Sequence, residues 1–517
     1  MLQRNLTAYL GLLLLAVVLR LPAFVGDYAT NDESIYWTAG QRIADGGHQY
    51  LDTWENKPPI IIWVYALFAW IFGEGGLTAL RVFTLAYLFI AAAMFNQLMY
   101  NWKFLPRFSV LPGALFLLAF CVPWYTLELN TEQLMALPML GALWLTARYY
   151  ELERRNPQTL FWIGVIAAIL VNIKFQGAVL ALAIYAGAFF IGNLTLRGFL
   201  LLFAGSFLTQ LVLLMVLYFN GSLGAFYDTA VLYSFDYLGL PGNPGETHST
   251  TDLLEYLKVY GAFLFLGLLG FIVLRGRIAT AIIRQRKIDS LFAIWLLTAL
   301  PTVFLGGRYY LHYMVLALPP LVFYTHYTLQ EIGGRWFGRL AVVLLLAFPV
   351  FSYSVWLGVA TTSNFERLRE QVPGISAEGW TRQMFYRVHL RPEESAILGW
   401  LEQHPQVEDI WVAAFRPQLY VRLGKKCGTK YTNFSMAYFK MEWLEHNLRR
   451  RGGLISDTET MAATYEAFRE HLPPLIIDPE GVFADMRRHI PTLLNDYAPI
   501  PEEEGFQGWY LPAQPSR

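Results

Sequence analysis

The stretch GDYATNDESIYWTAGQRIADGGHQYLDTWENKPPIIIWVYALFAWIFG, residues 26–73, follows the first membrane-length apolar run directly and is rich in charged side chains. Charges beside hydrocarbon are costly unless they pair, face water or take part in chemistry. The apolar pattern predicts two short helices, 34–44 and 59–72. Both are too short to span a bilayer, for which a helix needs about 20 residues. We therefore expect a loop whose helices lie on the membrane and hold acidic residues at its surface. Four tryptophans suit the membrane–water interface: Trp37, Trp54, Trp63 and Trp70.

The composition is that of a membrane protein. Of 517 residues, 55% are hydrophobic and only 15% are charged, and the formal net charge is zero. Global charge thus argues for no nucleic-acid partner. With only Cys121 and Cys427, there is no disulfide framework, and two free thiols are favoured over a single bridge.

Apolar runs predict a polytopic α-helical protein with about eleven spans. They lie near 5–24, 78–99, 108–125, 133–149, 158–173, 177–193, 199–219, 254–275, 289–305, 313–328 and 339–359. Residues 1–20 could also be a signal peptide, but the run is long and no small-residue cleavage site is clear, which favours an uncleaved first span.

The distribution of basic residues predicts the orientation. With the N-terminus in the cytoplasm, nearly every inner loop carries Lys or Arg, as expected for a protein of the plasma (inner) membrane. The outer loops before residue 360 carry few: Arg42, Lys57, Arg81, Lys174 and Arg308. This places the first loop, residues 25–77, outside the cytoplasm.

Beyond residue 359 the composition becomes that of a soluble domain. We predict a transmembrane domain over 1–359 and a small extracytoplasmic α/β domain over 360–517. Its predicted elements are helices at 395–404, 436–451 and 462–471 and strands at 409–414 and 474–477. The outer loop at 220–253 contains a Gly-, Pro-, Ser- and Thr-rich stretch and is either a mobile cover or a connector.

The order of residues in the first loop carries a family likeness. It holds Asp32-Glu33, Tyr36, Gly46-Gly47, Tyr50, Lys57-Pro58-Pro59 and Phe72-Gly73. This pattern resembles the first extracytoplasmic loop of integral-membrane glycosyltransferases of the GT-C class, and most of all the bacterial branch related to protein O-mannosyltransferases and the aminoarabinose transferase of lipid A. The likeness covers about residues 5–330. It implies transfer of a sugar from a polyprenyl- or dolichyl-phosphate donor to an extracytoplasmic hydroxyl acceptor in the cell envelope: a glycan, a lipid or a protein.

Binding of the donor phosphate requires cations at the outer membrane surface. Lys57, Lys174 and Arg308 are the candidates, the last with Tyr310 and His312 close by in sequence. The Lys174-Phe175-x-Gly177 turn and the Arg308-x-Tyr310-x-His312 segment also resemble the family, which implies donor-phosphate binding there. Alternatively, each cation extends to the interface or pairs with lipid headgroups.

A carboxylate must take the proton of the attacking hydroxyl. The resemblance assigns this role to Asp32, with Glu33 orienting its neighbours or contacting the acceptor. Asp27 is a local rival, and Asp32 could also serve as a helix N-cap, because NDES precedes an apolar helix.

Further acidic residues stand at the outer ends of the third and fourth spans. Glu132, more than Glu128, is expected to position the acceptor or modulate Asp32, or it simply starts a helix. A divalent metal is a weaker possibility, because no spacing among the candidate ligands is diagnostic. Those candidates are Glu55, His48, Asp52 and His312.

Two other functions remain open from the sequence. A lipid or glycan flippase would explain many spans with charges at their edges, although such transporters often contain inverted repeats and midplane charges, which this sequence lacks. The protein could also be a non-catalytic scaffold of a cell-envelope complex, in which Asp32 could be replaced without loss of activity.

Overall fold

The computed structural model describes most of the membrane part and portions of the C-terminal part. The described residues are 2–25, 30–101, 110–121, 126–151, 156–192, 194–235, 250–274, 283–303, 311–332, 336, 340–343, 345–347, 351, 392–413, 416–430, 432, 472–479 and 494–512.

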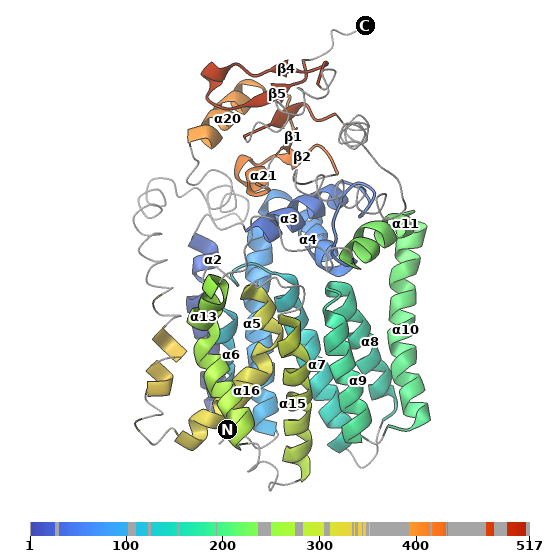
Figure 1. Cartoon of the computed structure of the whole chain (residues 1–517), viewed down its shortest axis with the longest axis vertical. Helices are drawn as coiled ribbons and strands as arrows, with labels where there is room; N and C mark the ends of the chain where they lie inside the picture. The colour runs from blue at the N-terminus through green and yellow to red at the C-terminus, as the bar shows by residue number, and fades with distance from the viewer. Residues whose placement is uncertain are drawn as a thin grey trace.

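Long apolar helices form a bundle (Figure 1). They are α1 (Leu2–Arg20), α5 (Gly76–Asn101), α6 (Leu111–Phe120), α7 (Thr131–Glu151), α8 (Gln158–Ile173), α9 (Gly177–Gly192), α10 (Leu196–Phe219), α13 (Thr250–Leu269), α15 (Ile283–Val303) and α16 (Leu318–Ile332). Shorter helical turns are α2 (Pro22–Val25), η1 (Gly73–Gly75), α11 (Leu223–Phe226), η2 (Tyr227–Leu232), η3 (Gly270–Leu274) and η5 (Leu311–Leu316).

Each of the first ten predicted spans overlaps one of these helices. Among the described residues, three helical runs are long and apolar enough to cross a membrane: Pro59–Asn101, Leu196–Phe219 and Tyr256–Val273. The predicted span at 339–359 lies mostly outside the described residues. The chain is thus a multi-pass membrane protein by the character of its helices, and α1 packs against α5 and α6 as part of the bundle.

The first loop forms α3 (Asn31–Ala44) and α4 (Pro59–Phe72) at one end of the bundle, opposite the start of α1 (Figure 1). Helix α4 begins and ends where the sequence predicts, because Pro58-Pro59 open it and Gly73 adopts a positive φ of 53° after it. Helices α3 and α4 pack closely: a Cβ on Gly40 would lie 2.8 Å from the backbone nitrogen of Ala66. A side chain at position 40 would push the two helices apart.

The predicted surface character of this loop is wrong in part. Trp37 and Trp54 are 1% and 4% exposed, because Trp37 packs into the bundle core and Trp54 into the C-terminal domain. Glu33 and Glu55 are each 1% exposed rather than held at the surface. Trp70, at 72% exposed, fits the interface prediction.

The C-terminal domain contains a mixed sheet in the order β2-β1-β3-β5-β4. Strand β1 pairs parallel with β2 and β3, whereas β5 runs antiparallel to β3 and β4. Its elements are α20 (Pro392–Gln403), β1 (Asp409–Val412), α21 (Gln418–Leu423), β2 (Lys426–Cys427), β3 (Leu475–Ile477), β4 (Ala498–Pro499), η6 (Glu502–Glu504) and β5 (Gly508–Tyr510). The strands predicted at 409–414 and 474–477 and the helix at 395–404 are confirmed, and the helices predicted at 436–451 and 462–471 lie outside the described residues.

The C-terminal domain sits at the same end of the bundle as α3 and α4 (Figure 1). Helix α21 and strand β2 contact α3 directly. Part of the loop predicted at 220–253 is helical and forms α11 and η2. Phe226 of α11 packs against Tyr50 of the first loop, with ring centroids 5.3 Å apart. Residues 236–249, which include most of the Gly/Pro-rich stretch, lie outside the described part. Both cysteines are free and buried, as expected.

Candidate active site

The first turn of α3 presents Asp32. The helix starts three residues earlier than predicted, and Thr30 is its N-cap: its hydroxyl accepts a hydrogen bond from the Glu33 amide at 3.2 Å. The capping role considered for Asp32 is therefore wrong. Asp32 is partly buried, and its carboxylate makes no hydrogen bond or ion pair within the described part of the chain.

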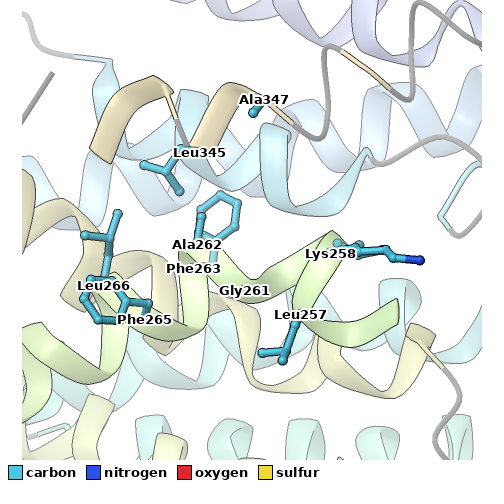
Figure 2. Close-up of a pocket in the computed structure, with 10 residues that line it drawn as sticks. Leu257, Lys258, Gly261, Ala262, Phe263, Phe265, Leu266, Leu345 and Ala347 are labelled. Atoms are coloured by element: carbon cyan, nitrogen blue, oxygen red, sulfur yellow. The ribbon is translucent and has the colours of Figure 1, made fainter. Parts of the chain in front are cut away.

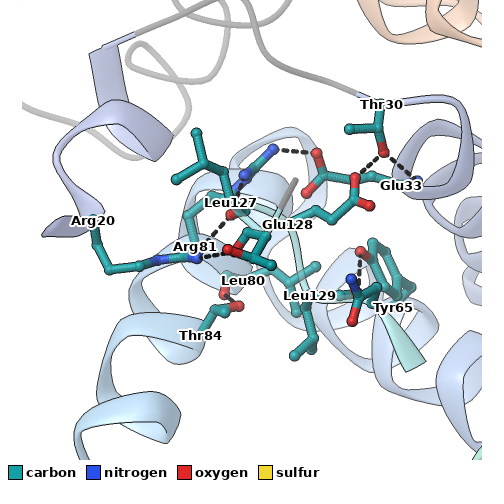
Figure 3. A network of polar contacts seen from close by, with 12 residues as sticks. Arg20, Thr30, Glu33, Tyr65, Leu80, Arg81, Thr84, Leu127, Glu128 and Leu129 are labelled. Carbon is teal, nitrogen blue, oxygen red and sulfur yellow. Dashed lines mark hydrogen bonds and ion pairs between the residues drawn. The ribbon is translucent and has the colours of Figure 1, made fainter. Parts of the chain in front are cut away.

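Glu33 points into the protein and forms a fully buried ion pair with Arg81 on α5. Arg81 also donates to the carbonyl of Leu127, as does Arg20 at the end of α1; Arg20 donates in addition to the Thr126 carbonyl at 2.7 Å. Figure 3 shows the guanidinium groups of Arg20 and Arg81 converging on the Leu127 carbonyl, and Arg81 also reaching Glu33. We call Arg20, Glu33 and Arg81 the arginine clamp. It joins α1, α3 and α5 to the segment 126–130 and fixes the helix start that carries Asp32.

Glu128 lies beside the clamp and accepts a hydrogen bond from the Thr30 hydroxyl (Figure 3). Burial raises the pKa of Glu128 well above its ordinary value, and the charges of Glu33 and Asp32 raise it further. Burial and the two neighbouring carboxylates thus favour the neutral form of Glu128 at this position.

Glu132 opens α7 and forms an ion pair with Lys174, which follows α8 in the turn before α9. The Thr131 hydroxyl donates to the same carboxylate at 2.8 Å, and the His312 ring nitrogen Nε2 lies 3.9 Å from its Oε1. Lys174 is 8% exposed, and its ammonium lies 4.2 Å from the ring centroid of Tyr313. Lys174 is thus held inside the protein with a counter-ion, which contradicts a role of extending to the lipid headgroups.

Lys57 lies in a tightly built turn. Its side chain is 24% exposed, and its ammonium lies 3.7 Å from Glu55 Oε1 and 2.6 Å from Asn56 Oδ1. The Tyr50 hydroxyl donates to the Lys57 carbonyl at 2.8 Å. The backbone of Tyr50 has a positive φ of 71°, which is unusual for a residue with a side chain. Such strain in a non-glycine residue persists only where the surroundings impose it. Lys57 is therefore a positioned cation that remains more accessible than Lys174.

Tyr36 lies among the carboxylates of Asp32, Glu55 and Glu132. It lies one helical turn after Asp32 and packs edge-on against Tyr65, with ring centroids 5.6 Å apart. Burial raises the pKa of Tyr36 well above its ordinary value, and the nearby carboxylates of Asp32, Glu55 and Glu132 raise it further. The structure thus brings Asp32, Glu132, Lys57, Lys174 and His312 together at the end of the bundle that carries α3 and α4.

Some predicted site residues lie outside the described part, namely Arg308, Tyr310 and the rival base Asp27. Of the metal candidates, His48 is exposed, and its backbone amide donates to Asp52 Oδ2 at 2.6 Å. Glu55 Oε1 accepts the amides of Asn56 and Lys57. Within the described ranges, no three His, Cys, Asp or Glu side chains form a group that could hold a metal ion.

Sequence reasoning missed Arg20 and the true environment of Arg81. Arg81 was counted as one of the outer-loop cations, yet both arginines are fully buried. A signal was available: Arg20 ends an apolar run and Arg81 interrupts another, and a charge there must find a partner. Which partner each arginine finds depends on how the helices assemble.

We expect replacement of Glu55 by glutamine to stabilise the protein increasingly as the pH rises. Burial raises the pKa of the Glu55 carboxyl, although Lys57 and the Asn56 and Lys57 amides favour its ionised form. A carboxyl with a raised pKa in the folded state favours folding below its unfolded pKa of about 4.3, and that contribution is lost as the pH rises through the folded pKa. Thermal unfolding of Glu55→Gln and wild type from about pH 4 to about pH 8 checks this.

The matched control is Glu393→Gln, which removes a carboxylate from a partly exposed ion pair with Arg416, whose side chains are 29% and 33% exposed. With rising pH, the midpoint of thermal unfolding of Glu55→Gln should increase relative to that of wild type. A relative decrease with rising pH would contradict an unfavourable ionisation of the buried Glu55 carboxyl.

A separate apolar hollow of 350 Å³ lies between α13 and residues 345–347. Figure 2 shows Leu266 and Phe263 on α13 facing Leu345, with the Lys258 side chain extending away at one edge. It contains none of the acid–base or phosphate-binding candidates.

No family model and no curated protein sequence matches this chain. Among solved structures, ArnT from Cupriavidus metallidurans bound to undecaprenyl phosphate superposes with a TM-score of 0.58 and 14% identity, covering 98% of each chain. The archaeal oligosaccharyltransferase AglB from Archaeoglobus fulgidus, in complex with an inhibitory peptide and a dolichol-phosphate, gives a TM-score of 0.54 and 11% identity, covering 98% of this chain and 74% of AglB. Both neighbours are GT-C glycosyltransferases. The chain therefore has the GT-C fold that its first-loop sequence pattern predicted.

Proposed function

We propose that this protein is a glycosyltransferase that moves a sugar from a polyprenyl-phosphate donor to a hydroxyl acceptor outside the cytoplasm. The observation that carries the proposal is the environment of Asp32. Its carboxylate is free of partners within the described residues, whereas the neighbouring Glu33 and Glu132 are committed to ion pairs. The sequence resemblance, which assigns the base of the reaction to Asp32 in this loop, supports the proposal.

In the proposed reaction, the acceptor oxygen attacks the anomeric carbon of the donor sugar. The bond from that carbon to the phosphate oxygen breaks, the hydroxyl proton passes to Asp32, and polyprenyl phosphate leaves with the bonding electrons. Lys57 stabilises the negative charge that develops on the phosphate, a form of electrostatic transition-state stabilisation. Arg308, with Tyr310 and His312, is proposed as a second contact to the same phosphate.

The paired residues are assigned supporting roles. Glu33 positions the start of α3 through Arg81, and Glu132 holds Lys174 and orients the acceptor side of the site. Because Lys174 already has a counter-ion, it contributes less to phosphate binding than Lys57. The lipid carriers in the two structural neighbours, undecaprenyl phosphate and dolichol-phosphate, support a lipid-linked donor. An outer location of the site and of the C-terminal domain follows from the distribution of basic residues.

The stereochemistry of the product tests the function. One displacement inverts the anomeric configuration, so the transferred sugar should have the opposite anomeric form to the donor. The measurement is the NMR coupling of the anomeric proton in the purified glycosylated acceptor. Retention of configuration would contradict a single displacement assisted by Asp32.

We expect Lys57→Met to weaken the binding of undecaprenyl phosphate by about 10- to 100-fold, because hydrogen bonds to charged groups are strong contributors. The assay is a titration of the purified protein with radiolabelled undecaprenyl phosphate. Arg148→Met is the matched control, since it removes a cation at the far end of α7, where Arg148 stacks over Trp144. Equal affinities for wild type and Lys57→Met would remove Lys57 from the phosphate site.

A further inference from the structure

Helix α3 presents one side to the C-terminal domain. The Gln418 amide donates to the Asn31 side chain, and Asp45, at the end of the helix, forms an ion pair with Lys426 at 2.7 Å. Arg42, on the same side, donates to a main-chain carbonyl of β2 at 3.4 Å. At 3.6 residues per turn, Asn31, Arg42 and Asp45 share this side, and Asp32 is rotated by about 100° from it. The contacts therefore hold α3 without covering Asp32.

Trp54 provides a second attachment. Its backbone amide donates to the Lys430 carbonyl at 2.7 Å, and its side chain is 4% exposed within the core of the C-terminal domain. Its ring also packs edge-on against Tyr233, a residue of the membrane part that follows η2 and joins the same core, with centroids 5.0 Å apart. Trp54 belongs to the first loop, directly before Glu55 and three residues before Lys57. The core of one domain is thus completed by a residue from the other.

The two attachments differ in strength. The Asp45 and Lys426 side chains are about half exposed, and exposed ion pairs contribute little. The buried indole removes a large apolar surface from water and is the dominant contact. Displacement of the domain would pull on Trp54 and, through it, on the strained turn that carries Lys57.

We propose that the C-terminal domain holds the site in the arrangement needed for sugar transfer, with Trp54 as the positioning residue for Lys57 and with the contacts to α3 holding Asp32. This inference rests on the proposed function. A displacement of about 1 Å in a reacting arrangement costs about 10²-fold in rate. The domain then has a direct part in catalysis although none of its described residues is assigned to the reacting groups.

The test compares Trp54→Ala, Trp54→Phe and Trp400→Ala in the full-length protein. Trp400 is the matched control, because it is a buried tryptophan of the same core that stacks on His404 and packs edge-on against Tyr510, both within the domain. Four quantities are measured: kcat and KM for transfer, the Kd for undecaprenyl phosphate, and hydrogen exchange over residues 49–57. Exchange at the amide of residue 54 reports docking directly, since its acceptor is the Lys430 carbonyl.

Trp54→Ala should lower kcat by about 10²-fold, weaken undecaprenyl phosphate binding and speed exchange over 49–57. Trp54→Phe should recover most of each loss, and Trp400→Ala should leave exchange over 49–57 unchanged with a smaller loss of kcat. Gln418→Ala, which removes only the contact with Asn31, should lower kcat in the same direction by a smaller factor; it decides the question if Trp54→Ala does not fold.

Faster exchange in Trp54→Ala or Gln418→Ala with an unchanged kcat would overturn the inference while leaving the proposed function intact. An equal loss of kcat in Trp400→Ala, without faster exchange, would also overturn it, because domain stability alone would then explain the effect. If wild type transfers no sugar, the proposed function fails. The positioning of Lys57 by Trp54 is then tested by the Kd for undecaprenyl phosphate. Faster exchange in Trp54→Ala with an unchanged Kd would overturn the inference as well.

Discussion

Asparagine at position 32 is expected to lower the rate of sugar transfer by about 10²–10⁴-fold, the usual contribution of a general base. The amide cannot accept the hydroxyl proton, yet it has nearly the same size as the carboxylate. Because Thr30 rather than Asp32 caps α3, the substitution should leave the helix intact. The measurement is the initial rate of transfer together with the Kd for undecaprenyl phosphate, which should stay close to that of wild type.

Asp52→Asn is the matched control for this experiment. Asp52 is an acidic residue of the same loop, but its carboxylate accepts the His48 amide, a contact that the asparagine side chain can also make. An unchanged rate in Asp32→Asn would remove Asp32 from the mechanism and direct attention to Asp27 or Glu132.

Removal of Arg81 should produce the largest loss of stability. Arg81→Met leaves Glu33 buried without its partner, and breaking a buried ion pair costs about 3–5 kcal/mol. The double variant Glu33→Gln/Arg81→Met removes the uncompensated charge and should recover most of that loss. Wild type, Glu33→Gln, Arg81→Met and the double variant form a double-mutant cycle. Their chemical unfolding in mixed micelles gives the coupling free energy between the two side chains.

The cycle also separates stability from activity. In the double variant the start of α3 is less firmly held, so transfer should stay below that of wild type even where stability is regained. A single Arg81→Met variant as stable as wild type would contradict the arginine clamp as the element that fixes this helix.

The first loop shows how far the sequence alone leads. The bounds of α4 could be predicted because two prolines, an apolar run and a glycine are all local signals. The start of α3 was missed by three residues, because both Thr30 and Asp32 are suitable caps and the choice depends on the packing that follows. The place of Lys57 directly before α4 could be predicted, since Pro58 follows it in sequence, whereas its role in phosphate binding stays a prediction.

The burial of charge could not be predicted in the same way. Glu33 and Arg81 are 48 residues apart, and Arg20 meets its carbonyl partners 106 and 107 residues away, so the pairing depends on how the helices assemble. Trp54 was placed at the membrane interface by its residue type, but the C-terminal domain offers it an apolar core instead. The same assembly turns Lys174 from an expected surface cation into the partner of Glu132.

The most direct test of glycosyl transfer uses purified protein in lipid vesicles that contain a polyprenyl-phosphate sugar labelled in the sugar, with an extract of envelope acceptors outside. The proposed function predicts that the label moves covalently to an acceptor with release of an equal amount of polyprenyl phosphate, and that Asp32→Asn abolishes both. Labelled lipid that crosses the bilayer with its sugar still attached, and no labelled acceptor, would contradict it and would identify a flippase.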